Sequence, residues 1–277
     1  MEYVEAGGAQ IPKLGLGTWQ NTGPTCAETV RTALDLGYRH VDTAQAYDNE
    51  RQVGAGIAAA DVNREEVFLT TKVWRSNLHR QDVFDSVRAS LEKLETGYVD
   101  LLLIHWPHPR VSVAETLRAM EELQEMGLVE HIGVSNFTRS QLRKARRVAD
   151  SPVVVDQVLY HPYKDQSDLR EYCVRHGLAL TAYSPLARRQ VLADEELERI
   201  GARYDKRPAQ IALRWLVQQD GVVAIPKTTS REHLAQNLAI FDFSLTDDEM
   251  DRIDAREGDL GTRLRNRLPS LMRRLPV

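Results

Sequence analysis

Eight short apolar runs, separated by longer stretches of helical periodicity, constrain the fold of this chain more than any other feature. The runs are nearly continuous in hydrophobicity, as in Leu101 to Ile104, so other parts of the protein must cover both faces of each predicted strand. Strands of this kind are typical of parallel sheets with helical crossovers. The runs span Leu14 to Trp19, His40 to Ala44, Val67 to Val73, Val99 to Trp106, His131 to Asn136, Val153 to Tyr160, Ala179 to Ser184 and Val222 to Lys227.

Predicted helices fill the stretches between these runs. Glycine follows the last periodic residue of several of them, as at Gly37, Gly127 and Gly177, which is a common helix stop. The predicted helices cover Cys26 to Leu36, Asn49 to Ala60, Arg80 to Leu94, Ser112 to Met126, Thr138 to Ala149, Leu169 to His176 and Asp194 to Tyr204, and another begins near Arg231.

Eight such units in 277 residues favour an α/β fold of the (β/α)8 TIM barrel type, with a doubly wound open sheet as the alternative. The segment from Tyr3 to Leu14, with Gly7 and Gly8 in its middle, predicts an N-terminal β-hairpin that plugs the bottom of the barrel. No linker or low-complexity tract divides the chain. We therefore expect a single domain over residues 1–277, with residues 258–277 as an arginine-rich C-terminal tail.

The composition limits the classes of binding partner and the cell compartment that we expect for this protein. The 36 lysines and arginines face 40 aspartates and glutamates, a net charge of −4, so a broad basic surface for nucleic acid is not expected. Cys26 and Cys173 are too few for a disulfide scaffold and are typical of a reducing compartment. The N-terminus lacks the pattern of a signal peptide, and the longest apolar runs fall short of the roughly 20 residues that a membrane helix needs. These features predict a cytoplasmic protein with no membrane partner.

Polar side chains recur near the C-terminal ends of the predicted strands, roughly every 30 residues, which is about one βα unit. Parallel strands of a barrel end at the same rim, so we expect these side chains to line one mouth. They are Thr18 with Trp19, Asp42, Lys72, His105, Asn136, Gln157, Tyr183 and Lys227.

Three of these groups form a candidate catalytic unit. A lysine ammonium at a strand end, as at Lys72, needs a counter-charge when it is buried, and Asp42 on the adjacent strand supplies one. Tyr47 lies just past Asp42, and we expect the nearby ammonium to lower the pKa of its hydroxyl and make it a general acid. Each residue alone is also typical of a solvated loop, a cap or plain packing, but their combination indicates a site.

His105 ends an apolar run and precedes Trp106-Pro107. A neutral imidazole there would donate a hydrogen bond to a substrate carbonyl, although a structural histidine bonded to backbone is the alternative. The spacing of His105 and His108 is also found in metal sites, where both rings lie on one face of a helix. Pro107 prevents a helix here, so the two rings would not bind one ion. We expect no metal.

The motifs together resemble the aldo-keto reductases, from Gly15 to about Asn237 and in the family's order and spacing. The short loops resemble the prokaryotic branch that contains 2,5-diketogluconate reductases. The matching motifs are Gly15-Leu-Gly-Thr-Trp19, Asp42-Thr-Ala-Gln-Ala-Tyr47, Thr71-Lys72, Leu103-Ile-His-Trp-Pro107, Gly133-Val-Ser-Asn-Phe137 and Ile225-Pro-Lys227.

The resemblance implies a barrel that binds NADPH without a Rossmann domain and a catalytic tetrad of Asp42, Tyr47, Lys72 and His105. It also implies that Ser135, Asn136 and Gln157 hold the nicotinamide carboxamide, that Tyr183 stacks on its ring, and that Ser184-Pro185-Leu186-Ala187 runs along the pyrophosphate. The full expected cofactor set is Thr18, Trp19, Asp42, Ser135, Asn136, Gln157, Tyr183, Ser184, Leu186, Ile225, Lys227, Thr228, Thr229, His233, Gln236 and Asn237.

Lys227-Thr228-Thr229-Ser230 precedes a helix start, and its ammonium, hydroxyls and free amides suit a phosphate. In the family this segment grips the adenosine 2′-phosphate, so we expect NADPH, with NADH as a weaker alternative. His233 stands where many relatives carry arginine, which leaves the strictness of that preference open.

The resemblance therefore implies an NADP-dependent aldo-keto reductase that reduces small aldehydes or ketones to alcohols, with monomer as the default state. Apolar walls for the substrate are expected from Trp19, Trp74 and Trp106, beside Tyr47 and His105. One alternative is a regulatory module that keeps the cofactor without useful turnover. Another is an isomerase or aldolase on the same barrel, with Lys72 as a base or Schiff-base former.

Overall fold

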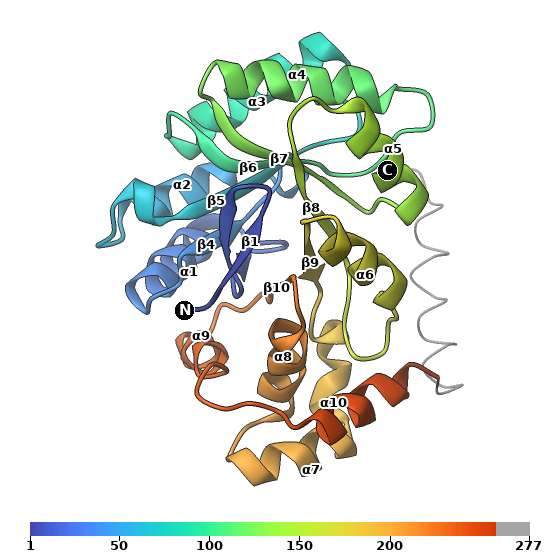
Figure 1. The fold of residues 1–277 in the computed structure, drawn as a ribbon. Helices are drawn as coiled ribbons and strands as arrows, with labels where there is room; N and C mark the ends of the chain where they lie inside the picture. The colour runs from blue at the N-terminus through green and yellow to red at the C-terminus, as the bar shows by residue number, and fades with distance from the viewer. Residues whose placement is uncertain (259–277) are drawn as a thin grey trace.

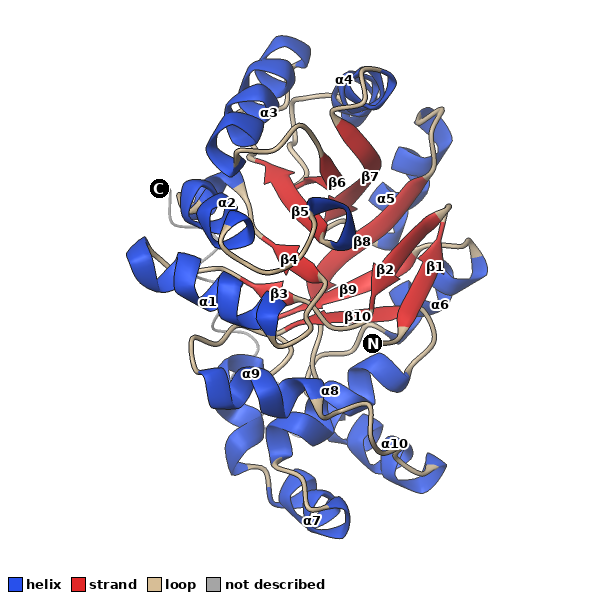
Figure 2. Ribbon diagram, turned by 90° about the vertical axis from the view of Figure 1, so that its left-hand side faces the viewer, coloured by secondary structure: helices blue, strands red, loops and turns tan. Residues whose placement is uncertain are grey.

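A computed structural model describes residues 1–258 of the chain, with side chains through Arg256. The expected C-terminal tail beyond Gly258 lies outside the described residues. Eight parallel strands form the centre of the molecule, and helices surround them (Figure 1, Figure 2).

The strands pair in the order β10-β9-β8-β7-β6-β5-β4-β3. A parallel bridge between Leu14 and Ala224 joins the first strand to the last, with hydrogen bonds from Gly15 N to Ala224 O (2.9 Å) and from Ala224 N to Lys13 O (2.8 Å). The predicted (β/α)8 barrel is thereby confirmed over the open sheet. The strands are β3 (Leu16–Gly17), β4 (His40–Asp42), β5 (Phe68–Val73), β6 (Val99–Ile104), β7 (Val129–Ser135), β8 (Val153–Leu159), β9 (Ala179–Tyr183) and β10 (Val222–Ile225).

Helices follow the strands and cover their outer faces. The α-helices are α1 (Gly23–Asp35), α2 (Glu50–Ala58), α3 (Arg80–Leu94), α4 (Val113–Glu125), α5 (Arg139–Val148), α6 (Ser167–Arg175), α7 (Glu195–Tyr204), α8 (Pro208–Gln218), α9 (Arg231–Leu238) and α10 (Asp247–Asp254). Short 3-10 helices are η1 (Gln45–Tyr47), η2 (Arg64–Glu66), η3 (Ala187–Ala193) and η4 (Ala255–Gly258). Up to Gly258, no helix has the length and apolar character to cross a membrane.

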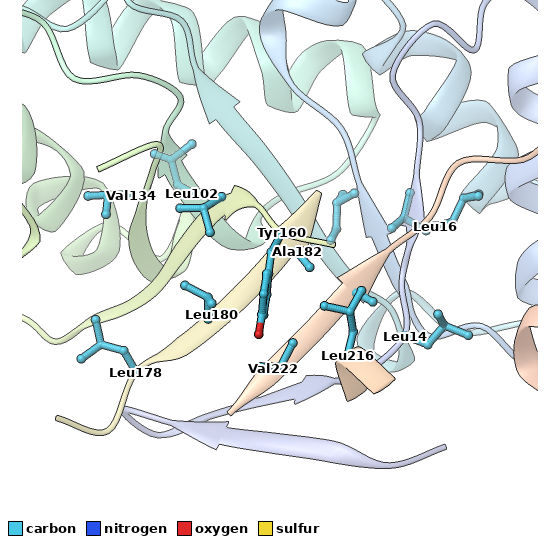
Figure 3. Close-up of a cluster of buried hydrophobic side chains, with 14 of the residues drawn as sticks. Leu14, Leu16, Leu102, Val134, Tyr160, Leu178, Leu180, Ala182, Leu216 and Val222 are labelled. Carbon is cyan, nitrogen blue, oxygen red and sulfur yellow. The ribbon is translucent and has the colours of Figure 1, made fainter. Parts of the chain in front are cut away.

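The apolar runs serve two separate cores because successive side chains of a strand point to opposite faces. In β6, Leu101 and Leu103 point into the barrel, whereas Leu102 and Ile104 join the larger core between the barrel and the helices. Part of that larger core is shown in Figure 3, where strand residues such as Leu180 and Val222 lie near Leu216 of α8. Both faces of the strand are therefore shielded from water, which is why consecutive residues along it are apolar.

The predicted N-terminal hairpin is present as β1 (Tyr3–Ala6) and β2 (Ala9–Pro12), joined by Gly7 and Gly8, both at positive φ. Its buried side chains, among them Ile11, pack against Leu101 and Leu103 inside the barrel. Gly7 lies against Pro152 and Val154, at the N-terminal end of β8, so the hairpin covers the end of the barrel opposite to the C-terminal strand ends.

Two α-helices were not among those predicted. The first, α8, is buried from Gln210 to Val217, and its polar residues Gln210 and Arg214 are buried with the rest. These two residues and Gln218 recur every four positions, a helical spacing that could have indicated this helix. The second, α10, is a short acidic helix with a Thr246 to Glu249 capping box. The first barrel strand is also shorter than predicted, because only Leu16 and Gly17 keep regular pairing with β4.

His40 is a buried imidazole at the start of β4. Its Nε2 lies 3.2 Å from Thr70 Oγ1, and its ring packs edge to face on Phe68 at a centroid distance of 5.2 Å. Gly15 makes room for the ring, since a Cβ at that position would lie 2.7 Å from His40 Nδ1. Burial lowers the pKa of His40 to about 4, so the folded protein holds it neutral.

We predict that His40 makes the fold sensitive to mild acid. Below about pH 6.5 His40 becomes protonated in the unfolded chain but stays neutral in the folded protein. The free energy of unfolding therefore falls as the pH drops toward about 4. Between about pH 7.5 and about pH 5, wild type should lose about 2 kcal/mol more unfolding free energy than His40→Gln, measured by urea denaturation. His233→Gln, at an exposed position, is the matched control and should behave as wild type. An equal loss in wild type and His40→Gln would contradict the lowered pKa.

Candidate active site

A cavity of 730 Å³ opens at the C-terminal ends of the barrel strands. The polar side chains predicted to share one rim do meet there. Of the predicted site residues, the cavity is lined by Thr18, Trp19, Asp42, Tyr47, Trp74, His105, Trp106, Ser135, Asn136, Gln157, Tyr183, Ser184, Ile225 and Lys227.

Lys72 lies fully buried beneath the cavity floor and is held by three oxygen atoms. Its Nζ donates to Asp42 Oδ1 at 2.5 Å, to the backbone oxygen of Thr43 at 2.7 Å and to Tyr47 Oη at 3.4 Å. Burial alone would lower the pKa of Lys72, but the Asp42 carboxylate and Tyr47 together raise it above its ordinary value. The ammonium therefore stays charged, and the predicted counter-charge from β4 is confirmed as a contact.

Tyr47 lies on the cavity wall in η1, partly exposed, with the Lys72 ammonium 4.9 Å from its ring centroid. The Lys72 ammonium lowers the pKa of this hydroxyl, as expected, but the net shift of the Tyr47 pKa is upward. Burial disfavours the phenolate and raises the pKa of Tyr47, and the nearby ammonium offsets only part of that effect. Tyr47 is consequently protonated at neutral pH, which is the state that a proton donor requires.

His105 follows β6 and is 8% exposed. Its ring packs edge to face on Tyr47 and on Trp74, at centroid distances of 5.7 and 5.1 Å. Burial, with a smaller contribution from the Lys72 charge, lowers the pKa of His105 to about 3. The imidazole is thus neutral, as the sequence predicted, and sits beside the hydroxyl of Tyr47.

A polar network connects the ends of β7, β8 and β9. Asn136 donates through Nδ2 to His105 O (3.1 Å) and accepts from Tyr183 Oη at 2.8 Å. Ser135 Oγ donates to Gln157 O at 2.8 Å, and Gln157 Nε2 donates to Asp42 Oδ2 at 2.7 Å. The side chains predicted to recognise a carboxamide are therefore already oriented by one another, by Asp42 and by the backbone of His105.

Unusual backbone conformations gather around this cavity. Five residues other than glycine have positive φ in the segments after β7 and β9: Asn136, Ser184, Ala187, Arg188 and Arg189. Conformations of this kind cost on the order of 1–3 kcal/mol each and persist where the surrounding structure holds them, often at functional sites. The strain is thus concentrated where the polar network and the cavity meet.

The rim beyond β10 has the features of a phosphate site. Lys227 lines the cavity, and in the described part of the chain its ammonium has no ion pair. The helix α9 begins just after it, capped by Ser230, whose Oγ accepts from His233 N at 3.3 Å. The amides of Arg231 and Glu232 in the first turn have no acceptor within residues 1–258. A free cation beside free helix amides fits a dinucleotide phosphate.

Several predicted cofactor residues do not line the cavity. Gln236 borders a separate hollow of 530 Å³ together with residues of α7 and α8, and its Nε2 donates to Glu232 at 2.7 Å. Asn237 is 5% exposed and does not reach the cavity. Leu186, Thr228, Thr229 and His233 also lie outside the lining.

Six lining residues were not predicted from the sequence. Leu159 and His161 alternate with Gln157 at the end of β8, so the two-residue period of a strand would have identified them. Arg188 and Gln190 left no signal, because a turn with positive φ but without glycine is not recognisable from sequence. Gly17 and Ala46 complete the set, whereas Ala187 belongs to the segment expected along the pyrophosphate and lines the cavity.

Known proteins share both sequence and structure with this chain. The family model described as aldo/keto reductase family matches residues 13–257. Glyoxal reductase of Bacillus subtilis is 41% identical over 253 residues, covering 91% of both chains. Methylglyoxal reductase DkgB of Salmonella typhimurium is 41% identical over 248 residues, covering 88% of this chain and 92% of its own.

Solved structures agree with these relatives. The crystal structure of a protein provisionally named 2,5-diketo-D-gluconic acid reductase B superposes with a TM-score of 0.91 at 46% identity, covering 92% of this chain and 91% of its own. The match supports the resemblance to the prokaryotic branch. This chain is an oxidoreductase that belongs to the aldo/keto reductase family, whose members use nicotinamide cofactors.

Proposed function

We propose that this enzyme reduces small aldehydes or ketones to alcohols with NADPH, using Asp42, Tyr47, Lys72 and His105 as its catalytic tetrad. The observation that carries the proposal is the Lys72 ammonium, which contacts both the Asp42 carboxylate (2.5 Å) and the Tyr47 hydroxyl (3.4 Å) at the mouth of the barrel. The names of relatives, which denote reductases of glyoxal and methylglyoxal, support small carbonyl substrates.

The bound nicotinamide would supply the hydride, and negative charge would then develop on the carbonyl oxygen. Tyr47 donates the proton that this oxygen needs, and neutral His105 donates a hydrogen bond that orients the carbonyl. Lys72 stabilises the phenolate that Tyr47 leaves behind, while Asp42 keeps Lys72 charged. Trp19, Trp74 and Trp106 surround the substrate with apolar surface.

The alternatives have less support. Lys72 is fully buried and does not line the cavity, so it does not reach a substrate as a Schiff-base former in an isomerase or aldolase. A regulatory module without turnover is not supported by the relatives, since those named above are reductases. An intact set of proton donor, ammonium and carboxylate also favours turnover.

The cofactor residues keep the roles that the family resemblance implies. Ser135, Asn136 and Gln157 would hold the carboxamide, and Tyr183 would stack on the ring. Lys227 and the start of α9 would hold the 2′-phosphate of NADPH, with NADH as the weaker cofactor. The remaining members, among them Thr228, Thr229 and His233, would frame the adenosine end.

Tyr47→Phe should lower kcat by roughly 100- to 10,000-fold, because it removes the proton donor. Binding of NADPH, followed by quenching of tryptophan fluorescence, should stay within about twofold of wild type, because little else changes. Tyr98→Phe, the same substitution just before β6 and outside the cavity lining, is the control and should retain full activity. Full activity in Tyr47→Phe would eliminate it as the acid.

Lys227→Ala should raise the Kd of NADPH about 10- to 100-fold, the worth of one charge-assisted contact, and leave the Kd of NADH nearly unchanged. The physical reason is that NADH lacks the 2′-phosphate that the ammonium would meet. Lys144→Ala, at an exposed position of α5, is the matched control. Equal weakening of both cofactors would contradict a role at the 2′-phosphate.

We further propose a monomeric, single-domain protein of the cytoplasm. Cys26 and Cys173 are buried free thiols, which suits a reducing compartment. Among residues 1–258 the exposed large apolar side chains, such as Trp19, Met126 and Leu192, come from separate segments and suit an unpartnered surface. Light scattering on the purified protein should give a mass near 31.4 kDa, and a mass of twice that value would refute the monomer.

A further inference from the structure

A second histidine reaches the active-site cavity and has no role in the tetrad. Gln157, Leu159 and His161 all line the cavity at the two-residue period of a strand, whereas Tyr160 belongs to the outer core. The side chain of His161 is only 4% exposed. His161 is therefore a nearly buried polar group on the wall of a cavity that takes ligands.

A backbone contact decides which nitrogen of this ring carries the proton. Tyr163 N donates to His161 Nδ1 at 3.2 Å, so Nδ1 acts as an acceptor and carries no hydrogen. Burial, with a smaller contribution from the Lys164 charge, lowers the pKa of His161 to about 4, and the ring is neutral at neutral pH. A neutral imidazole keeps one proton, which here lies on Nε2. The loop after β8 thus fixes His161 as a hydrogen-bond donor through Nε2.

This Nε2–H group is left without a partner by the protein. Within residues 1–258 the ring uses Nδ1 alone for hydrogen bonding. Nε2 is also not sealed in the interior, in contrast to the Nδ1 atoms of His40 and His105, which are buried without a partner. Since His161 lines the cavity, a molecule bound there is what this donor can meet.

Covering this donor without offering an acceptor would be costly. A ligand that fills the cavity displaces water from its wall, and a buried N–H group left unpaired costs about 1–3 kcal/mol. A ligand with an oxygen atom at this place avoids that cost, and an analogue without the oxygen is disfavoured. His161 therefore discriminates between ligands by the presence of an acceptor oxygen.

The donor is separate from the groups proposed to act on the reacting carbonyl. His105 follows β6, whereas His161 follows β8. The strand β7 lies between them, so the ends of β6 and β8 are about 10 Å apart, at about 4.8 Å for each step in the sheet. An oxygen bound by His161 is consequently not the carbonyl oxygen that Tyr47 protonates, and it lies across the mouth of the barrel from it.

We propose that His161 is a ligand-binding residue whose Nε2–H donates to a hydroxyl or carbonyl oxygen remote from the reacting carbonyl. The inference rests on the proposed function, because that function supplies the ligands of the cavity. Two of them carry such an oxygen, namely a carbonyl substrate with further hydroxyl groups and the ribose of the nicotinamide half of the cofactor. Both accept the same neutral hydrogen bond, so matched probes must separate them.

Two substitutions separate the roles of the two ring nitrogens. The amide of asparagine takes the place of Nδ1, and that of glutamine takes the place of Nε2. His161→Asn thus keeps an acceptor for Tyr163 N but removes the donor in the cavity, whereas His161→Gln does the reverse. His161→Asn should weaken binding about 3- to 10-fold, the worth of one neutral hydrogen bond, and His161→Gln should stay within about twofold of wild type. A purely structural role predicts the opposite order and would contradict the proposal.

Matched ligands then identify the oxygen. If it belongs to the substrate, His161→Asn lowers kcat/KM for D-erythrose about 3- to 10-fold and leaves that for butanal, which has the same chain length but no hydroxyl groups, unchanged. If it belongs to the cofactor, the Kd values of NADPH, NADH and reduced nicotinamide mononucleotide rise by that factor. The Kd of 2′,5′-ADP, which lacks the nicotinamide half, stays the same. Wild-type values for all these ligands in His161→Asn would overturn the proposal.

A measurement independent of turnover separates this inference from the proposed function. In protein labelled at histidine, ¹⁵N NMR at neutral pH should show a protonated Nε2 and an unprotonated Nδ1 for His161, identified by the signals lost in His161→Asn. The Nε2 proton signal should move when NADP+ or D-erythrose is added. The opposite tautomer, or a signal that responds to neither ligand, would refute the site even if wild type reduces aldehydes with NADPH.

The proposed function fails by a different result. Wild type that binds no dinucleotide and reduces no aldehyde would refute that function, whatever the state of the His161 ring. Thermal melting of His161→Asn and His161→Gln confirms that both variants are folded.

Discussion

The buried contact between Lys72 and Asp42 is the constraint on which the site depends. An ammonium that is fully buried without a partner would cost several kcal/mol and would tend to lose its proton. Asp42 prevents this at 2.5 Å, and its second oxygen accepts from Gln157. One carboxylate thereby joins β4, β5 and β8. The charge that stabilises a tyrosine phenolate is preserved inside a strand framework that holds it in place.

The barrel can support this polar centre because its apolar packing is separated from it. The inner core, closed by the N-terminal hairpin, occupies the opposite end of the barrel, and the outer core ties the strands to the helices. The residues other than glycine with positive φ in the described chain lie outside the barrel strands, as in the turn after β9. Rigid strands thus position the reacting groups, while the loops supply groups that contact ligands.

The cations at the mouth of the barrel differ in burial and in pairing. Lys72, the innermost cation, is fully buried and paired with Asp42. Lys227 and Arg188 line the cavity and have no ion pair in the described chain. Neutral His105 and protonated Tyr47 line the same cavity, and the ring of His105 packs against the indole of Trp74. Such an arrangement suits the anionic groups of the proposed dinucleotide on one side and an uncharged carbonyl on the other.

Much of the barrel and the grouping of Asp42, Tyr47, Lys72 and His105 could be predicted from sequence, because strand runs, helix stops and polar residues at strand ends are local signals that a barrel brings to one rim. Other properties depended on tertiary structure. The direction of the Tyr47 pKa shift reflects a balance between burial and the Lys72 charge, and no sequence spacing reports how deeply a phenol is packed. The polar side chains Gln210 and Arg214 of α8 are enclosed instead of facing solvent, and Arg188 reaches the cavity through a left-handed turn without glycine. Sequence determined which groups meet, whereas three-dimensional packing decided their burial, and burial sets their protonation and their access to ligands.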